Sequence, residues 1–161
     1  MKHSARGFTL IELLIVVAII LIIAAIAIPN LIRSRIAANQ VSAVESLRMI
    51  NTSEASYAAT YGIGYSAGLL QLGPPIAGAQ VTSSAAGLLD SVVANGLKSG
   101  YAFVYSPAFV DANGHYNGYT ATASPTEPGV TGTTYYFTDQ TDVIRANTAG
   151  TATASDSAVA N

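Results

Sequence analysis

A run of apolar residues near the N-terminus constrains this chain more than any other feature of its sequence. From Leu13 to Ile28 nearly every residue is apolar, and the segment from Phe8 to Ile28 has 21 residues. As a helix that rises 1.5 Å per residue it would be about 31 Å long, close to the roughly 30 Å hydrocarbon core of a bilayer. The sequence therefore predicts a helix that can span a membrane.

Basic residues precede this run and do not occur within it. Lys2 and Arg6 lie in a short N-terminal leader. The positive-inside rule predicts that the leader stays in the cytoplasm and that the rest of the chain lies outside. A cleavable signal peptide is the alternative, because Ala24, Ala25 and Ala27 resemble the small residues of a cleavage site.

Glu12 is the one acid in this segment. A carboxylate at such a depth costs about 2.5 to 3.5 kcal/mol on insertion scales, so it normally has a partner or a function. One explanation is a Glu side chain that reaches the edge of the membrane. In the other, cleavage between Gly7 and Phe8 creates an amino group at similar depth, with which Glu12 of a neighbouring subunit pairs. The second explanation predicts a polymer, and an acid would be unusual in a disposable signal peptide.

The N-terminal residues resemble a known signature. The stretch Arg6-Gly7-Phe8-Thr9-Leu10-Ile11-Glu12, with the apolar residues that follow it as far as Pro29 and Asn30, resembles the prepilin signature of type IV pilins and type II secretion pseudopilins. The resemblance covers about residues 6–35. It implies that a prepilin peptidase removes residues 1–7, cuts after Gly7 and N-methylates Phe8. It also implies that Glu12 neutralises the Phe8 amine of an adjacent subunit during assembly.

The same resemblance implies partners and a location. The subunit would wait in the inner membrane as a single-pass protein, surrounded by lipid and with a cytoplasmic N-terminus. An inner-membrane assembly platform would then add it to a homo-oligomeric helical filament outside the cell. We expect a structural subunit of a type IV pilus, a filament class used in cell adhesion and twitching motility. A pseudopilin of a type II secretion system is the first alternative, and a monomeric membrane-anchored binding domain with an intact leader is the second.

The helical pattern continues beyond Pro29. A proline inside a helix costs about 3 kcal/mol, which predicts a kink, local melting or the end of the helix at that point. Apolar residues then recur at spacings of three and four, and glycines follow as stop signals. We expect a continuous or kinked helix over 8–61, with 8–28 as its membrane and assembly half. The apolar positions are Ile36, Ala43, Val44, Leu47, Ile50, Tyr57, Ala58 and Tyr61, while the charged residues Arg33, Arg35, Glu45, Arg48 and Glu54 fall mostly on the other face.

Residues 62–146 are predicted to form a globular α+β head. A loop over 62–82 and a short helix capped by Ser83 or Ser84 and reaching Ala94 precede several β-rich runs. A small antiparallel sheet of three or four strands, laid on the second half of the long helix, would bury both apolar faces. This is the pilin-like α+β fold that the resemblance implies. Residues 147–161 are nearly all small or polar and are predicted to be a flexible tail.

The composition argues against chemistry and nucleic-acid binding. The net charge of −2 provides no basic surface for nucleic acid, and the absence of Cys excludes disulfides and thiolate metal sites. His115 lies in a turn without clustered acids, and Asp111, or Asp139 with Asp142, supplies only part of a calcium ligand set. We therefore expect no catalytic residues, no cofactor and no bound metal. The tyrosines are interpreted as core and interface aromatics, with electron transport along a filament as the less favoured interpretation.

Overall fold

The computed structural model describes residues 8–159, so the predicted leader, with Gly7, lies outside the described residues. The chain divides into two compact units, residues 1–35 and residues 36–161. Their boundary falls within one helix, α1, which runs from Leu10 to Tyr61.

Helix α1 continues through Pro29. Local melting and a helix end at this residue, two of the predicted outcomes, are therefore not observed. The φ angle of proline is itself close to the helical value, so the penalty is confined to one missing hydrogen bond and a local steric adjustment. One turn later the Ser34 hydroxyl donates to the Asn30 carbonyl at 3.0 Å, as serine commonly does inside helices.

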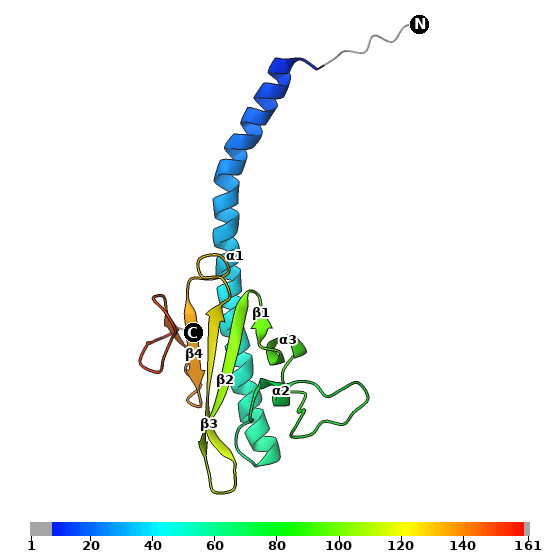
Figure 1. Cartoon of the computed structure of the whole chain (residues 1–161), viewed down its shortest axis with the longest axis vertical. Coiled ribbons are helices and arrows are strands. Elements are labelled where there is room, and N and C mark those ends of the chain that lie inside the picture. Colours follow the sequence, from blue (N-terminus) through cyan, green and yellow to red (C-terminus); the bar gives the residue numbers. More distant parts are fainter. Residues whose placement is uncertain (1–7, 160–161) are drawn as a thin grey trace. The chain divides into compact units, whose positions relative to one another are not determined.

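The sheet contains six antiparallel strands in the order β1-β2-β3-β4-β5-β6 (Figure 1). The predicted fold class, a long N-terminal helix with an antiparallel sheet, is confirmed. The sheet has more strands than expected because β1 and β6 are two residues long, too short to show a recognisable alternation. The bounds are Leu97–Lys98, Tyr101–Val110, Tyr116–Pro125, Tyr135–Asp139, Arg145–Asn147 and Ser157–Ala158.

The core of the head lies between the second half of α1 and one face of the sheet. The helix contributes residues spaced by three, four and seven, as the apolar periodicity predicted. On the sheet, small residues lie opposite large ones: Ala123 pairs with Phe103, and Ala121 pairs with Tyr105. This alternation lets the aromatic rings fill the space beside the helix. The main buried residues are Ala43, Leu47, Ile50 and Tyr57 from α1 and Tyr101, Phe103, Tyr119, Ala121 and Ala123 from the sheet.

The short helices of the head differ from the prediction. Helix α2 spans Leu69–Leu72 within the segment predicted to be a loop, and α3 spans only Ser91–Ala94. Asp90, rather than Ser83 or Ser84, caps α3, because its carboxylate accepts from the Val92 and Val93 amides at 2.8 and 3.1 Å. Gly87 has a φ of 64°, a left-handed conformation that interrupts any helix begun at the serines.

A carboxylate lies in the core where the sequence predicted a solvated helix face. Glu54 is fully buried and accepts hydrogen bonds from the Ser66 amide at 2.9 Å and the Ser66 hydroxyl at 2.5 Å. A buried acid is tolerated only when such donors replace its water. Glu54 thereby fixes the segment after α1 to the helix.

Tyrosine hydroxyls complete this polar network. Tyr119 donates to Oδ1 of Asn51 at 3.1 Å, and Tyr105 donates to the Ser66 carbonyl at 3.1 Å. Burial raises the pKa of Tyr105 and Tyr119 well above the usual value, so both remain protonated donors at neutral pH. Burial, with Tyr136 nearby, raises the pKa of Tyr101 to about 12.

The C-terminal residues form an ordered arm, which corrects the predicted flexible tail for residues 147–159. Strand β6 pairs with β5, and Ala152 is only 2% exposed. Asp156 holds the intervening turn: its carboxylate accepts from the Thr153 amide at 2.7 Å and from Nδ2 of Asn147 at 2.9 Å. The prediction failed because it counted apolar residues and not these local hydrogen bonds.

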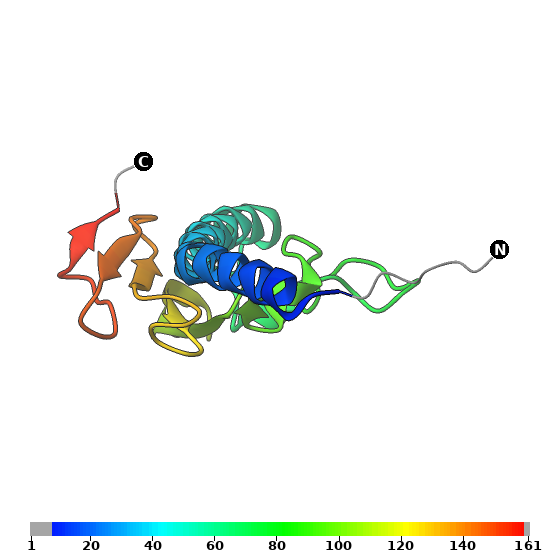
Figure 2. The same ribbon diagram turned by 90° about the horizontal axis from the view of Figure 1, so that it is seen from above.

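The arm and a long loop lie at opposite edges of the head. Figure 2 shows the second half of α1 on one side of the sheet, with β5 and β6 at one edge. The loop that contains residues 74–88 projects at the other edge.

We predict that the hydrogen bonds of Asp156 in the C-terminal arm stabilise the head at neutral pH and that this stabilisation is lost at acid pH. Hydrogen bonds from the backbone and side chain of Thr153 hold the pKa of the Asp156 carboxyl below its usual range. Its contribution is therefore complete above about pH 5 and declines as the pH falls through the unfolded value near 3.9 toward the folded value. Asp156→Asn should reduce the drop in melting temperature between pH 6 and pH 3, measured by tyrosine near-ultraviolet circular dichroism in detergent.

Ser155→Ala is the matched control for this variant, because it removes a hydroxyl that contacts Thr153 at 2.9 Å without removing a charge. Its acid-induced drop in melting temperature should equal that of the wild type. Identical pH profiles for Asp156→Asn and the wild type would contradict the assignment.

Candidate assembly site

The start of α1 is organised by a reciprocal pair of side chains. The Thr9 amide and the Thr9 hydroxyl both donate to Oε2 of Glu12, at 2.9 and 2.5 Å. In return the Glu12 amide donates to the Thr9 hydroxyl at 3.3 Å. This is a capping box, in which the first and fourth residues of the pattern satisfy backbone donors that a helix leaves unpaired at its N-terminus.

Thr9 is a functional residue that the sequence analysis did not single out. Its signal was present, because a Ser or Thr three residues before a Glu and directly before an apolar run is the sequence pattern of a capping box. The sequence analysis interprets Glu12 through its cost in a membrane and through the resemblance, and not as part of a helix cap. The structure gives Glu12 a second role, in starting the helix.

The capping box uses only one oxygen of the carboxylate. Among the described residues, Oε1 of Glu12 accepts no hydrogen bond, and the side chain is exposed. A carboxylate has about four lone-pair sites and can serve two donors on different sides. Glu12 can therefore hold the helix start through Oε2 and receive a further cation through Oε1.

The surface around Glu12 is apolar and uncovered. None of the large apolar side chains between Phe8 and Ile32 is buried, and Phe8 itself is 79% exposed. By length and composition, α1 is also the one helix of the described residues that could cross a membrane. In a water-soluble protein this stretch would normally be buried in a core, so it requires lipid or other protein to cover it.

The structure places the predicted site residues in two groups. Phe8 lies two residues before α1 and Glu12 lies in its first turn, whereas Pro29 is 17 residues beyond Glu12, about 26 Å at the rise of an α-helix. Gly7, the predicted cleavage site, lies outside the described residues. Pro29 thus cannot contact the capping box of its own chain.

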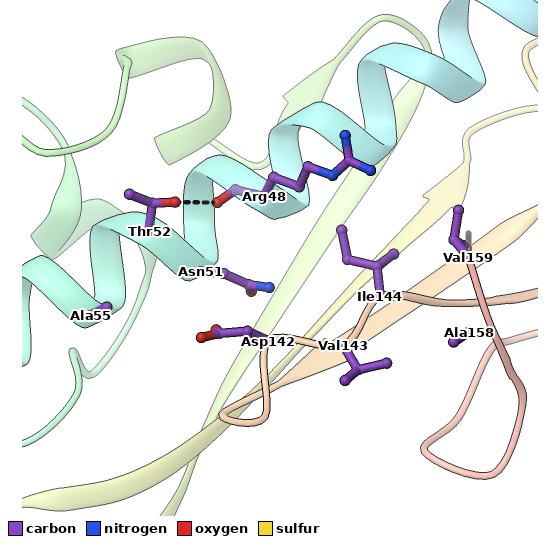
Figure 3. A pocket seen from close by; sticks show the side chains of 9 residues that line it. All are labelled: Arg48, Asn51, Thr52, Ala55, Asp142, Val143, Ile144, Ala158 and Val159. Atoms are coloured by element: carbon purple, nitrogen blue, oxygen red, sulfur yellow. Dashed lines mark hydrogen bonds between the residues drawn. The ribbon is translucent and has the colours of Figure 1, made fainter. Parts of the chain in front are cut away.

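A hollow of about 640 Å³ lies in the head between α1 and the β5 edge of the sheet. Figure 3 shows its side chains; the dashed line is the 3.0 Å bond from the Thr52 hydroxyl to the Arg48 carbonyl. The side-chain amide of Asn51 donates to the Thr138 hydroxyl and accepts from the Tyr119 hydroxyl. Tyr119 also donates to Asp142 at 3.3 Å. Asn51 and Asp142 in this hollow are therefore engaged in hydrogen bonds that hold the head together. The lining residues are Arg48, Asn51, Thr52, Ala55, Asp142, Val143, Ile144, Ala158 and Val159.

The acids considered for calcium are engaged in local turns. Oδ1 of Asp111 accepts from the Asn113 and His115 amides at 2.8 and 2.9 Å, and Oδ2 lies 3.5 Å from Nδ1 of His115. Oδ1 of Asp139 accepts from the amide and hydroxyl of Thr141 at 2.9 and 2.6 Å. Within residues 8–159 no three His, Cys, Asp or Glu side chains converge as a metal site.

Comparisons with known proteins match the N-terminal segment. Residues 2–28 match the family described as "Prokaryotic N-terminal methylation motif". The chain is similar to the "Type IV major pilin protein PilA" of Myxococcus xanthus, with 54% identity over 52 residues, 32% of this chain and 24% of that protein. It is also similar to the "Type IV wide pilus major component PilA4" of Thermus thermophilus, with 65% identity over 37 residues, 23% of this chain and 28% of that protein.

The matches thus span about a quarter of the length of these curated relatives. No solved structure matches the chain. The type IV pilin signature predicted from residues 6–35 is confirmed by the family match and by both relatives.

We predict that Thr9→Val loosens the first turn of α1. The variant keeps the shape of the side chain but removes the hydroxyl that pairs with Glu12, and loss of such a cap costs about 0.5 to 2 kcal/mol. Amide hydrogen exchange in detergent micelles should become faster at Glu12 and Leu13, while Thr9→Ser should retain the wild-type protection. Equal exchange in the valine variant and the wild type would show that the capping box does not stabilise this turn.

Proposed function

We propose that this chain, whose N-terminal segment is that of a type IV pilin, is a structural subunit of a type IV pilus. It would be stored in the inner membrane, processed between Gly7 and Phe8, N-methylated at Phe8 and polymerised through α1. As a structural pilin it would need no catalytic residue and no cofactor. The observation that carries this proposal is the combination of an uncovered apolar helix half with an exposed carboxylate at its start.

The energetics favour transfer from lipid into a bundle of like helices. In the membrane the apolar side chains contact acyl chains, and in a filament they would contact each other, so their burial is retained in both states. Glu12 differs between the two states, because its carboxylate in lipid has no cationic partner. Pairing of Oε1 with the Phe8 amine of a neighbour would offset a cost of about 2.5 to 3.5 kcal/mol per subunit.

The proposal implies a sequence of partners. A prepilin peptidase would act on the leader at the cytoplasmic face of the inner membrane, and an inner-membrane assembly platform would add the mature subunit to the fibre. The finished homo-oligomer would lie outside the cell, where type IV pili serve in adhesion and twitching motility. The similarity to two major pilus components supports the major-subunit role.

Processing can be tested at the predicted cleavage site. Intact-mass spectrometry of the membrane fraction should find a wild-type chain that lacks residues 1–7 and carries one methyl group on Phe8. Gly7→Val should leave the full-length mass, because the peptidase would no longer accept the bond. Ser4→Val, a control change within the leader, should be processed like the wild type; cleavage of Gly7→Val at the same bond would refute the assigned site.

Assembly can be tested at Glu12. Glu12→Val should insert into the membrane and be processed, yet give few fibres, because the Phe8 amine of the neighbour would remain as an unpaired buried charge at about 3 to 5 kcal/mol. Glu12→Gln keeps the capping geometry and should also assemble poorly. Fibre yield is measured by shearing and immunoblotting against the membrane-retained pool.

Glu45→Gln is the matched control for both Glu12 variants, because Glu45 is an exposed carboxylate on the same helix that pairs with Arg48 at 2.8 Å. It should assemble normally. A wild-type fibre yield from Glu12→Val would count against the proposed mechanism.

A further inference from the structure

The two units of this chain carry opposite charge. The segment just after the apolar run, residues 29–36, contains two arginines and no acid. The head, residues 36–161, contains three basic residues, Arg48, Lys98 and Arg145, against eight acids: Glu45, Glu54, Asp90, Asp111, Glu127, Asp139, Asp142 and Asp156. Copies that associate side by side would therefore bring a basic segment toward acidic heads.

The two arginines are exposed and point in different directions. Arg33 and Arg35 are two residues apart on α1, about 200° around the helix, so they lie on nearly opposite faces. Neither enters an ion pair within the described residues. Each is available to a different neighbour.

Hydrogen bonds hold the loop that carries Glu127 against α1 at the level of Asn39. Its loop, between β3 and β4, is closed by bonds from the Thr131 amide to the Glu127 carbonyl at 2.9 Å and from the Glu127 amide to the Thr131 hydroxyl at 3.1 Å. Nδ2 of Asn39 then donates to the Thr131 carbonyl at 2.9 Å, and Figure 1 shows the loop beside α1. Glu127 is exposed and enters no ion pair in the part of the chain that the structure describes.

The proposed assembly contact fixes the offset between neighbouring helices. If the Phe8 amine of one copy meets Glu12 of the next, the two parallel helices are displaced by four residues, about 6 Å. Residue 35 of the first copy then lies level with residue 39 of the second. This is the residue that anchors the loop of Glu127.

We propose that Arg35 of one copy pairs with Glu127 of an adjacent copy in the filament. This inference rests on the proposed function, because the offset comes from the Phe8 and Glu12 contact. The pair lies outside the apolar bundle, where a charge pair contributes more to register and specificity than to affinity. It links the helix of one subunit to the head of the next, a contact that the N-terminal bundle alone does not provide.

Charge reversal tests the pair in the full-length chain, in cells that assemble the wild type. Arg35→Glu and Glu127→Arg should each lower the yield of sheared fibres about tenfold, because like charges then face each other at every repeat. The double variant Arg35→Glu with Glu127→Arg should return the yield to within about twofold of the wild type, since the pair is restored with reversed polarity. Near-ultraviolet circular dichroism in detergent verifies that the Glu127→Arg head is folded.

Arg33 supplies the matched control, because it has the same chemistry on the opposite face. Combining Arg33→Glu with Glu127→Arg should not restore assembly. Rescue by Arg33→Glu instead of Arg35→Glu would overturn the assignment, as would wild-type yields from both single variants. A double variant as defective as Arg35→Glu, together with a loss of membrane-retained subunit, would also overturn it and would identify anionic lipid headgroups as the partner of Arg35.

The outcomes separate this pair from the function on which it rests. If the wild type is never processed or forms no fibres, the proposed function fails and the pair fails with it. If the wild type forms fibres, Glu12→Val does not, and Arg35→Glu assembles normally, only the pair is refuted.

Discussion

The large apolar side chains in the first half of α1 are not covered by the described residues. Those from Phe8 to Ile32 are all exposed, and at about 25 cal/mol per Å² of apolar surface such exposure is too costly to persist in water. Lipid and a bundle of like helices cover methyl groups about equally well, so burial alone does not choose between them. Under the proposed function Glu12 would make the difference, because a neighbouring chain can supply a cation to its carboxylate and a lipid tail cannot.

The second half of the same helix packs into the core of the head. Ala43 is the first buried residue along the described part of α1. Beyond it, buried apolar residues are accompanied by buried polar residues that hydrogen-bond the helix to the sheet and to the loops. Glu54 binds the segment after α1 through Ser66, and Asn51 binds β3 and β4 through Tyr119 and Thr138. Buried polar groups of this kind are stable only when fully satisfied, and within residues 8–159 no buried side-chain N or O atom lacks a partner.

Sequence patterns predicted the elements that repeat over several residues and missed those decided by single contacts. The helix α1 could be predicted because apolar residues recur on one of its faces, and β2, β3 and β4 because each is a run of residues that favour strands. The burial of Glu54 depends on Ser66, which lies 12 residues further along the chain, and no local pattern specifies that distance. The cap of α3 by Asp90 and the turn held by Asp156 are local, but each depends on one side chain of a type that is also common in solvated turns. At the assembly site, Glu12 and Phe8 were predicted from the cost of a buried acid and from the resemblance, and Pro29 was singled out by its effect on a helix. All three assembly roles remain predictions, whereas the Thr9 cap was available from its spacing alone.

In the proposed filament, the position of Glu12 would also determine the register of the helix bundle. Between Phe8 and Val44 it is the only acid, and from Leu13 to Ile28 every residue is apolar, so an amine at any other height along this apolar run would meet apolar side chains. A slip of one helical turn would therefore leave a buried charge unpaired, which acts as a penalty against the wrong alignment. The capping box adds to this selectivity, because Thr9 holds one carboxylate oxygen in place before assembly and so reduces the ordering that the contact requires. A uniformly apolar helix would tolerate many alignments with its neighbours, whereas under the proposed contact a single oriented carboxylate would select one offset.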